Sequence, residues 1–269
     1  LLTASNAVIE MCEKVGLEFA IVYEDRTIRS ILDQGGGNKI GLAKDDLLYI
    51  EKNYFPKSHY INIKNKPILL NFGPITLTSN EDWENIFSEI ITDFYFFPLA
   101  YHPQYYDLNT IADGVYSWVG EAQSDDFYNY GKQFDYLGGS GIFEFREFYE
   151  EGGWDNTGQS DILPREGNLL RETLQKSITS SVDFIQLITW NDWGEGTAIE
   201  PSVEYQFEPL SIIQEFVGAS FKKEDLDLSI SLYLKRKEYK NNSLVNKKLD
   251  QVFYYLVSLQ TSEAKEILD

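Results

Sequence analysis

The densest group of potentially reactive side chains lies in the segment ITWNDWGEGTAIEP, which runs from Ile188 to Pro201. Two carboxyl side chains, Asp192 and Glu195, are three positions apart there, and the glycine on either side of Glu195 allows a tight loop around them. Flanking tryptophans can exclude water from one carboxyl group and raise its pKa, which leaves a proton donor beside an ionised partner. Cleavage of a glycosidic bond needs this division of roles, because one acid protonates the leaving oxygen while a carboxylate acts as base or nucleophile.

The same spacing has two other interpretations. The acids can be structural, capping the next helix or pairing with Arg165 or Arg171. A metal site is disfavoured because neither of the two histidines, His59 and His102, lies nearby, and because hard-cation sites use more regularly spaced Asp and Asn residues. The single cysteine, Cys12, excludes an intrachain disulfide and a cysteine-based zinc site. We therefore expect no metal and no cofactor.

The composition narrows the ligand class. Aromatic residues make up 15% of the chain, and they can either stack on sugar rings or simply fill a core. The net charge of −20, from 23 basic and 43 acidic residues, repels phosphate backbones and anionic membranes. No apolar segment reaches the roughly 20 residues of a membrane span. A glycan is therefore a better candidate ligand than a nucleic acid or a lipid.

Short apolar segments alternate with amphipathic ones along the chain. Six segments are predicted strands, and they are 17–23, 67–72, 94–99, 114–118, 142–148 and 184–190. Predicted helices cover 1–16, 44–54, 80–91, 165–180 and 210–217. Strands that are apolar on both faces and alternate with helices predict a parallel sheet covered by helices.

This count predicts the fold class α/β, as a (β/α)8 barrel that lacks its first two strands. We assign residues 1–220 to the barrel, a catalytic domain that is incomplete at its N-terminus, and 221–269 to a C-terminal helical extension packed on it, with a helix at 245–259. A doubly wound open sheet is the alternative fold, but no GxGxxG motif follows the first strand. Segment 221–248 carries a local charge of +4, which leaves a partner-binding tail as an alternative role.

The first 16 residues lack the charged region and cleavage site of a signal peptide, so we expect the chain to begin inside an element. The sequence leaves localisation open, with export or the cell surface favoured over the cytoplasm if the protein degrades glycans. We expect a monomer.

Active sites of parallel barrels lie where the strands end at their C-termini. Tyr116 and Trp118 at the end of one strand can line a sugar subsite or fill the barrel mouth. His102 follows another strand and can bind substrate or serve the structure. Arg165 can pair with a catalytic acid, with substrate hydroxyls or with surface acids, and Trp193, between the two acids, is expected to shape the pocket.

Segment 188–201 resembles the signature of glycoside hydrolase families 71 and 99. Family 99, with N-E-W-H-E-G-T-x-I-E-P, contains endo-α-mannosidases and endo-α-mannanases, and family 71, with W-N-D-Y-G-E-S, contains α-1,3-glucanases. This chain resembles family 71 over Asn191-Asp192-x-Gly194-Glu195 and family 99 from Gly196 to Pro201. Weaker similarity covers most of the chain, and it includes Tyr23-Glu24, Tyr60 to Pro67, Tyr116-Ser117-Trp118 and Arg165-Glu166-Gly167.

The resemblance implies a (β/α)8 barrel with a catalytic pair at Asp192 and Glu195. In family 99 the first position is a glutamate that deprotonates the sugar 2-hydroxyl on the way to an anhydro-sugar, and the second is the acid/base. Asp192 is one methylene shorter than that glutamate. The family role that the resemblance supports best is therefore that of the acid, at Glu195. The resemblance also implies that Glu24, with Tyr23 beside it, contacts a sugar hydroxyl.

The predicted function is that of an endo-acting glycoside hydrolase, which cleaves an α-linked oligosaccharide or polysaccharide, mannan-like first and α-glucan second. A non-catalytic glycan-binding barrel is the alternative, because the aspartate at 192 departs from the family 99 pattern.

Overall fold

Parallel β-strands form the framework of the N-terminal part of the chain. The structure, a computed structural model, describes residues 2–99, 108, 110–153, 155, 158 and 160–269. The chain divides into two compact units, Leu1–Thr197 and Ala198–Asp269. Each unit has a hydrophobic core of its own.

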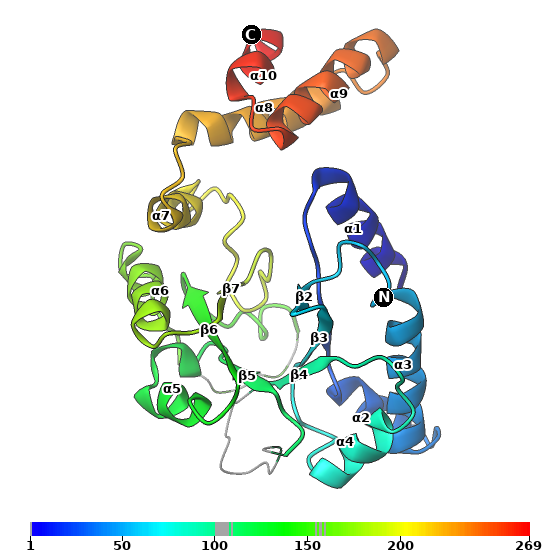
Figure 1. Cartoon of the computed structure of the whole chain (residues 1–269). Coiled ribbons are helices and arrows are strands. Elements are labelled where there is room, and N and C mark those ends of the chain that lie inside the picture. The colour runs from blue at the N-terminus through cyan, green and yellow to red at the C-terminus, as the bar shows by residue number, and fades with distance from the viewer. Residues whose placement is uncertain (1, 100–107, 109, 154, 156–157, 159) are drawn as a thin grey trace. The chain divides into compact units, whose positions relative to one another are not determined.

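The strands of the first unit follow one another in chain order (Figure 1). They are β1 (Ile21–Tyr23), β3 (Lys66–Asn71), β4 (Tyr95–Pro98), β5 (Gly114–Tyr116), β6 (Tyr136–Ile142) and β7 (Phe184–Ile188). β1, β3 and β4 pair in parallel, as do β5, β6 and β7, and a parallel bridge between Leu99 and Tyr116 connects the two groups. The short β2 (Asn62–Ile63) pairs antiparallel with β3.

Helices accompany these strands, as Figure 1 shows for α2 to α4 beside β3 and β4 and for α5 and α6 beside β5 and β6. The helices of this unit are α1 (Leu2–Val15), α2 (Arg26–Asp33), α3 (Lys39–Asn53), α4 (Asn80–Phe87), α5 (Asp125–Gly131) and α6 (Asn168–Thr179), with a 3-10 turn η2 (Glu121–Gln123). The predicted α/β architecture of parallel strands covered by helices is confirmed. A complete eight-stranded barrel is not formed by the residues that the structure describes.

Alternate residues of β3 pack into different cores. Leu69 packs with Phe96 and Trp83 in the core shared with the helices. Its neighbours Ile68 and Leu70 face the other side of the sheet, in a second core. Both faces of this strand are therefore buried, which explains why its sequence is apolar without alternation.

The fifth strand differs from the prediction. The sequence indicated 142–148, whereas β6 covers Tyr136–Ile142 and is rich in glycine, a residue disfavoured in strands. The reason is close packing: a Cβ atom on Gly138 would lie only 2.5 Å from a ring carbon of Phe184 and 2.8 Å from Cβ of Tyr116. The chain after Ile142 leaves the sheet and supplies a loop to the candidate site.

Several helices also differ from the prediction. α2, α5, α8 and α10 were not predicted, and α6 begins at Asn168 although the sequence indicated a start at 165. The later start has a backbone cause, because Arg165, Glu166 and Gly167 have φ angles of 50°, 58° and 75°, which a right-handed helix does not allow.

The second unit is helical. Its helices are α7 (Glu208–Val217), α8 (Lys223–Glu238), α9 (Ser243–Val257) and α10 (Thr261–Leu268). Leu228 and Leu232 of α8 pack with Val252 of α9 and Leu268 of α10. The helix predicted at 245–259 corresponds to α9. The sequence placed 198–220 with the barrel, whereas α7 lies within the second compact unit, and the domain boundary at 220 stays a prediction. Among the described helices, none is long and apolar enough to cross a membrane.

A buried carboxyl group ties the end of β1 to the loop after β3. Asp25 has no exposed surface, and its Oδ2 atom accepts hydrogen bonds from the backbone N–H groups of Ile75 (2.9 Å), Thr76 (2.6 Å) and Leu77 (2.8 Å). One side chain thereby joins the segments that follow the neighbouring strands β1 and β3.

Replacing Asp25 should therefore destabilise the first unit. Asp25→Ala leaves three N–H groups without their acceptor, and we expect a loss of about 3 kcal/mol or more in the free energy of unfolding. Urea denaturation measures this loss. Asp33→Ala is the matched control, because Asp33 is exposed and forms a surface ion pair with Arg29, and it should leave the midpoint unchanged. Equal midpoints for the two variants would contradict the role given to Asp25.

Candidate active site

The loop that carries the two acids is closed at its base. The N–H of Thr189 donates to the carbonyl oxygen of Thr197 at 2.9 Å, and the two threonine hydroxyls lie 2.9 Å apart. The hydroxyl of Thr189 also accepts the N–H of Asp192 at 3.0 Å. Residues 190–196 therefore form a compact turn directly after β7.

Both acids belong to this turn. Oδ1 of Asp192 accepts the backbone N–H of Glu195 at 3.0 Å, so that the two side chains start from neighbouring points. Asp192 is exposed, whereas Glu195 is partly buried. Gly196, with a φ of 60°, is needed here because a Cβ atom at this position would lie 2.8 Å from the carbonyl oxygen of Arg146.

The loop after β6 packs directly against the acid turn. The N–H of Arg146 donates to the carbonyl oxygen of Glu195, and that of Phe148 to the carbonyl oxygen of Gly194, both at 2.9 Å. The hydroxyl of Tyr149 then donates to Oε1 of Glu195 at 2.9 Å. Two loops from neighbouring parallel strands thus hold the glutamate between them.

The surroundings favour the protonated form of Glu195. Burial raises the pKa of its carboxyl group, the hydrogen bond from Tyr149 lowers it, and the negative charges of Asp192 and Glu147 raise it again. The nearby indole N–H of Trp118 lowers this pKa by a smaller amount. Oε2 of Glu195 is buried and makes no hydrogen bond to any residue that the structure describes. The balance is a pKa above the ordinary glutamate value, which suits a proton donor.

The source of this burial differs from the prediction. The sequence pointed to the flanking tryptophans, but Trp190 is 54% and Trp193 is 49% exposed. The aromatic groups that act on the Glu195 carboxyl are Tyr149 and Trp118, from the loops after β6 and β5. They are distant in sequence and come close only because the strands are parallel neighbours.

The two candidates at the end of β5 have different surroundings. Trp118 packs edge-on against Phe72, with ring centroids 4.9 Å apart, and its N–H lies near Glu195. Tyr116 is 1% exposed and donates its hydroxyl to the carbonyl oxygen of Asn71 at 3.0 Å. Tyr116 is therefore part of the core in this structure.

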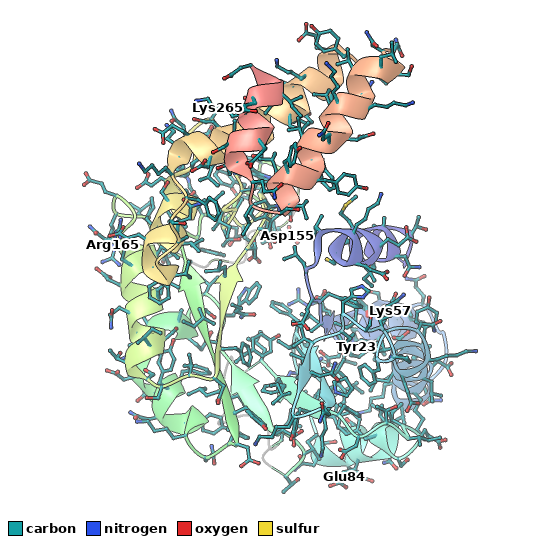
Figure 2. All side chains as sticks on the ribbon, turned by 45° about the horizontal axis from the view of Figure 1, so that its top comes forward. Tyr23, Lys57, Glu84, Asp155, Arg165 and Lys265 are labelled. Atoms are coloured by element: carbon teal, nitrogen blue, oxygen red, sulfur yellow. The ribbon has the colours of Figure 1, made fainter. Side chains whose placement is uncertain are left out.

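The remaining described candidates contact other residues in this structure. The hydroxyl of Tyr23 donates to Asp46 of α3 at 2.9 Å, and Glu24 pairs with Arg26 at 3.7 Å. Arg165 pairs with Glu172 of α6 at 2.5 Å, and Figure 2 shows it well separated from Tyr23. His102 lies outside the described residues.

Three polar residues were not among the predicted site residues. They are Glu147 and Tyr149, which act on Glu195, and Glu121 in η2 after β5. Burial raises the pKa of Glu121 to about 6, against the weaker opposing effect of the backbone N–H groups of Glu121 and Trp118. Oε2 of Glu121 is buried without a hydrogen bond to any described residue. Tyr149 and Glu121 each come soon after a predicted strand, which was a usable signal, whereas Glu147 fell inside the strand predicted at 142–148.

No group of three or more His, Cys, Asp or Glu side chains that could hold a metal ion is found within the described part of the chain. This arrangement offers a partly buried acid that can donate a proton to a ligand and an exposed one that can accept a proton from it. A ligand that loses or gains a proton at an oxygen atom fits it best.

Comparison with solved structures finds similar folds among glycosidases. One is the GH99 endo-α-mannosidase from Bacteroides thetaiotaomicron in complex with bis-tris propane, with 18% identity and a TM-score of 0.53, over 67% of this chain and 66% of that one. A second structure of the GH99 endo-α-mannosidase from this organism has 16% identity and a TM-score of 0.53, over 69% and 64% of the two chains. The chain thus spans slightly less than two thirds of the length of these structures.

The sequence matches no family model and no curated protein. At this identity the structural match shows the fold alone. The predicted resemblance to the family 71 and 99 group is confirmed at that level, since its structural neighbours are family 99 enzymes.

Removing the hydroxyl of Tyr149 should raise the pKa of Glu195. The Tyr149 hydrogen bond lowers that pKa, so Tyr149→Phe leaves burial and the neighbouring charges to act without it. Carbon NMR titration of labelled glutamate side chains measures the shift. Tyr233→Phe, on exposed α8, serves as the control and should leave the Glu195 titration in place. An unchanged or lowered pKa in Tyr149→Phe would contradict the assigned contact.

Glu121 should make the protein less stable as the pH rises. Its folded pKa of about 6 exceeds the ordinary value of 4.5, so the folded state keeps a proton that the unfolded state loses between these values. Stability from this group is complete below pH 4.5 and falls until about pH 6. We expect a loss of about 1 kcal/mol after allowance for its partial exposure.

Glu121→Gln should remove this slope and unfold at higher urea concentration than the parent at pH 7. Denaturation at pH 4, 5, 6 and 7 measures it, with Glu84→Gln on α4 as the exposed control. A variant that is less stable than the parent at pH 7 would contradict the raised pKa of Glu121.

Proposed function

We propose that this chain is the catalytic part of a glycoside hydrolase that cleaves within α-linked glycans, mannan-like chains first and α-glucans second. The observation that carries the proposal is the pair of acids on one turn after β7. Glu195 is half-buried, accepts a hydrogen bond from Tyr149 and has a raised pKa, and Asp192 beside it is exposed. The fold shared with GH99 endo-α-mannosidases supports the same class of reaction. The sheet is then six strands of a (β/α)8 barrel, with β1 and β7 as its edges among the described strands.

The two acids take different roles because their surroundings differ. Glu195 keeps its proton to higher pH than an ordinary glutamate and donates it to the leaving glycosidic oxygen. Asp192 accepts a proton from the group that attacks the sugar carbon of the cleaved bond. This group is the sugar 2-hydroxyl or a water molecule. Tyr149 donates a hydrogen bond to Oε1 of Glu195, whereas Oε2 is buried and makes no hydrogen bond to any described residue. Trp118 forms one wall of the sugar site, on the side of β5.

A second function has its own supporting observation. Oδ1 of Asp192 accepts the Glu195 N–H, which is what a residue that only closes a turn would do. A glycan-binding protein without turnover would keep the pocket and use Asp192 in this structural way. The two functions differ in whether any glycosidic bond is broken.

Incubation with three glycans distinguishes them. Yeast-type α-mannan, α-1,3-glucan and high-mannose oligosaccharides should be offered to the folded protein, and released products measured by chromatography. Oligosaccharide release from one of them is the expected result. Binding without any release would favour the non-catalytic alternative.

Variants of the two acids should respond differently to the leaving group. Glu195→Gln should reduce kcat/KM by about 10²- to 10⁴-fold on natural glycans, and much less on activated aryl glycosides that scarcely need protonation. Asp192→Asn should reduce both rates, because proton acceptance is needed whatever the leaving group. Glu84→Gln is the control for the amide substitution. Equal losses of Glu195→Gln on both substrates would contradict the role of Glu195 as acid.

A further inference from the structure

Three large aromatic side chains remain exposed around the acid turn. Trp190 is 54% exposed, Trp193 is 49% and Phe148 is 36%, and we call these three the rim aromatic patch. Trp190 and Trp193 belong to the turn after β7, on the two sides of Asp192 in sequence. Exposed rings of this size leave much apolar surface in water, and such surface commonly marks a binding site.

Hydrogen bonds join the Phe148 end of the patch to the acid turn. The N–H of Phe148 donates to the carbonyl oxygen of Gly194, which lies between Trp193 and Glu195 in the chain. The next residue, Tyr149, donates its hydroxyl to Glu195. The position of a Cβ atom on Gly194 is 3.4 Å from Oδ1 of Asp192 and 3.5 Å from a ring carbon of Tyr149, so aromatic and acidic groups adjoin at this glycine.

The charges at this place are negative. Asp192 and Glu147 both act on Glu195. The adjacent cation, Arg146, lies 3.8 Å from Asp161 and 5.4 Å from the centre of the Phe148 ring, so its charge is shared with an acid and a ring face. A ligand carrying carboxylate or phosphate groups would meet the charges of Asp192 and Glu147, which have its own sign.

We propose that the rim aromatic patch binds the sugar units that extend beyond the cleaved bond, and that it selects uncharged oligosaccharides over anionic ones. The proposal rests on the proposed function, because it uses the same acid turn. Pyranose rings present flat C–H faces that cover indole and phenyl rings, while their hydroxyls stay free for hydrogen bonds to the neighbouring acids. A chain of several sugars covers the patch, whereas a single sugar at the acids does not reach it.

Binding to a variant that cannot turn over tests the length dependence. Calorimetry on Glu195→Gln with α-linked manno- and gluco-oligosaccharides of one to five units should show affinity that increases with length. Adding Trp190→Ala should lower affinity for the longest oligosaccharides about tenfold, which is ~1.4 kcal/mol. Phe148→Ala should act in the same direction. Adding Tyr233→Ala is the matched control, because Tyr233 is 57% exposed on α8 in the second unit, and it should change nothing.

A separate binding experiment tests whether the patch selects against anionic oligosaccharides. Oligogalacturonides of matched length should bind at least tenfold more weakly than the neutral oligosaccharides at low salt, and the gap should narrow as salt screens the charges. Glu147→Gln should also reduce the difference in affinity between neutral and anionic oligosaccharides, because it removes one of the negative charges. Equal affinity for neutral and anionic chains would overturn the selection.

The outcomes separate this proposal from the proposed function. Hydrolysis of a glycan by the parent, with unchanged affinities in Trp190→Ala and Phe148→Ala, overturns the patch and leaves the hydrolase standing. Length-dependent binding that Trp190→Ala removes, without hydrolysis by the parent, supports the patch and overturns the hydrolase. Absence of binding at every length overturns the patch whatever the hydrolysis assay gives.

Discussion

Parallel pairing of β5, β6 and β7 is the constraint on which the candidate site depends. Because parallel strands end at the same edge, the loops that follow them meet there. Two backbone hydrogen bonds then fix the loop after β6 to the turn after β7. Glu195 acquires its environment from this contact, since neither loop alone would bury its carboxyl group.

The same contact creates a difference between two acids three residues apart. Glu195 turns inward to Tyr149 and Trp118, and burial raises its pKa, while Asp192 stays exposed at the start of the turn. Two carboxyl groups of similar chemistry in the sequence thus have different surroundings in the fold. Asp192 uses one oxygen to hold the turn, so the proton-accepting role that we propose for it would share this side chain with a structural one.

Aromatic residues divide between the core and the rim of the sheet. Tyr116, Phe97 and Trp83 are buried almost completely, whereas Trp190 and Trp193 remain half exposed beside the acids. A high aromatic content is therefore partly a packing property of glycine-containing parallel strands, as at Gly138, where two rings use the space of a missing side chain. Among the aromatic residues beside the acids, Trp190 and Trp193 have the rings that a ligand can reach most readily.

The sequence by itself determined the α/β class, six parallel strands, and the turn that holds Asp192 and Glu195, because apolar segments and short-range spacing are local properties. It misplaced the fifth strand, since the glycines of β6 are favourable only against the Phe184 and Tyr116 rings. The sequence also could not show that two of the predicted site residues have other partners. Tyr23 donates a hydrogen bond to Asp46, and Tyr116 lies in the core. Tertiary structure alone decided that Tyr149 and Trp118 surround Glu195, because burial and hydrogen bonding depend on residues brought together by strand pairing rather than by proximity in the chain.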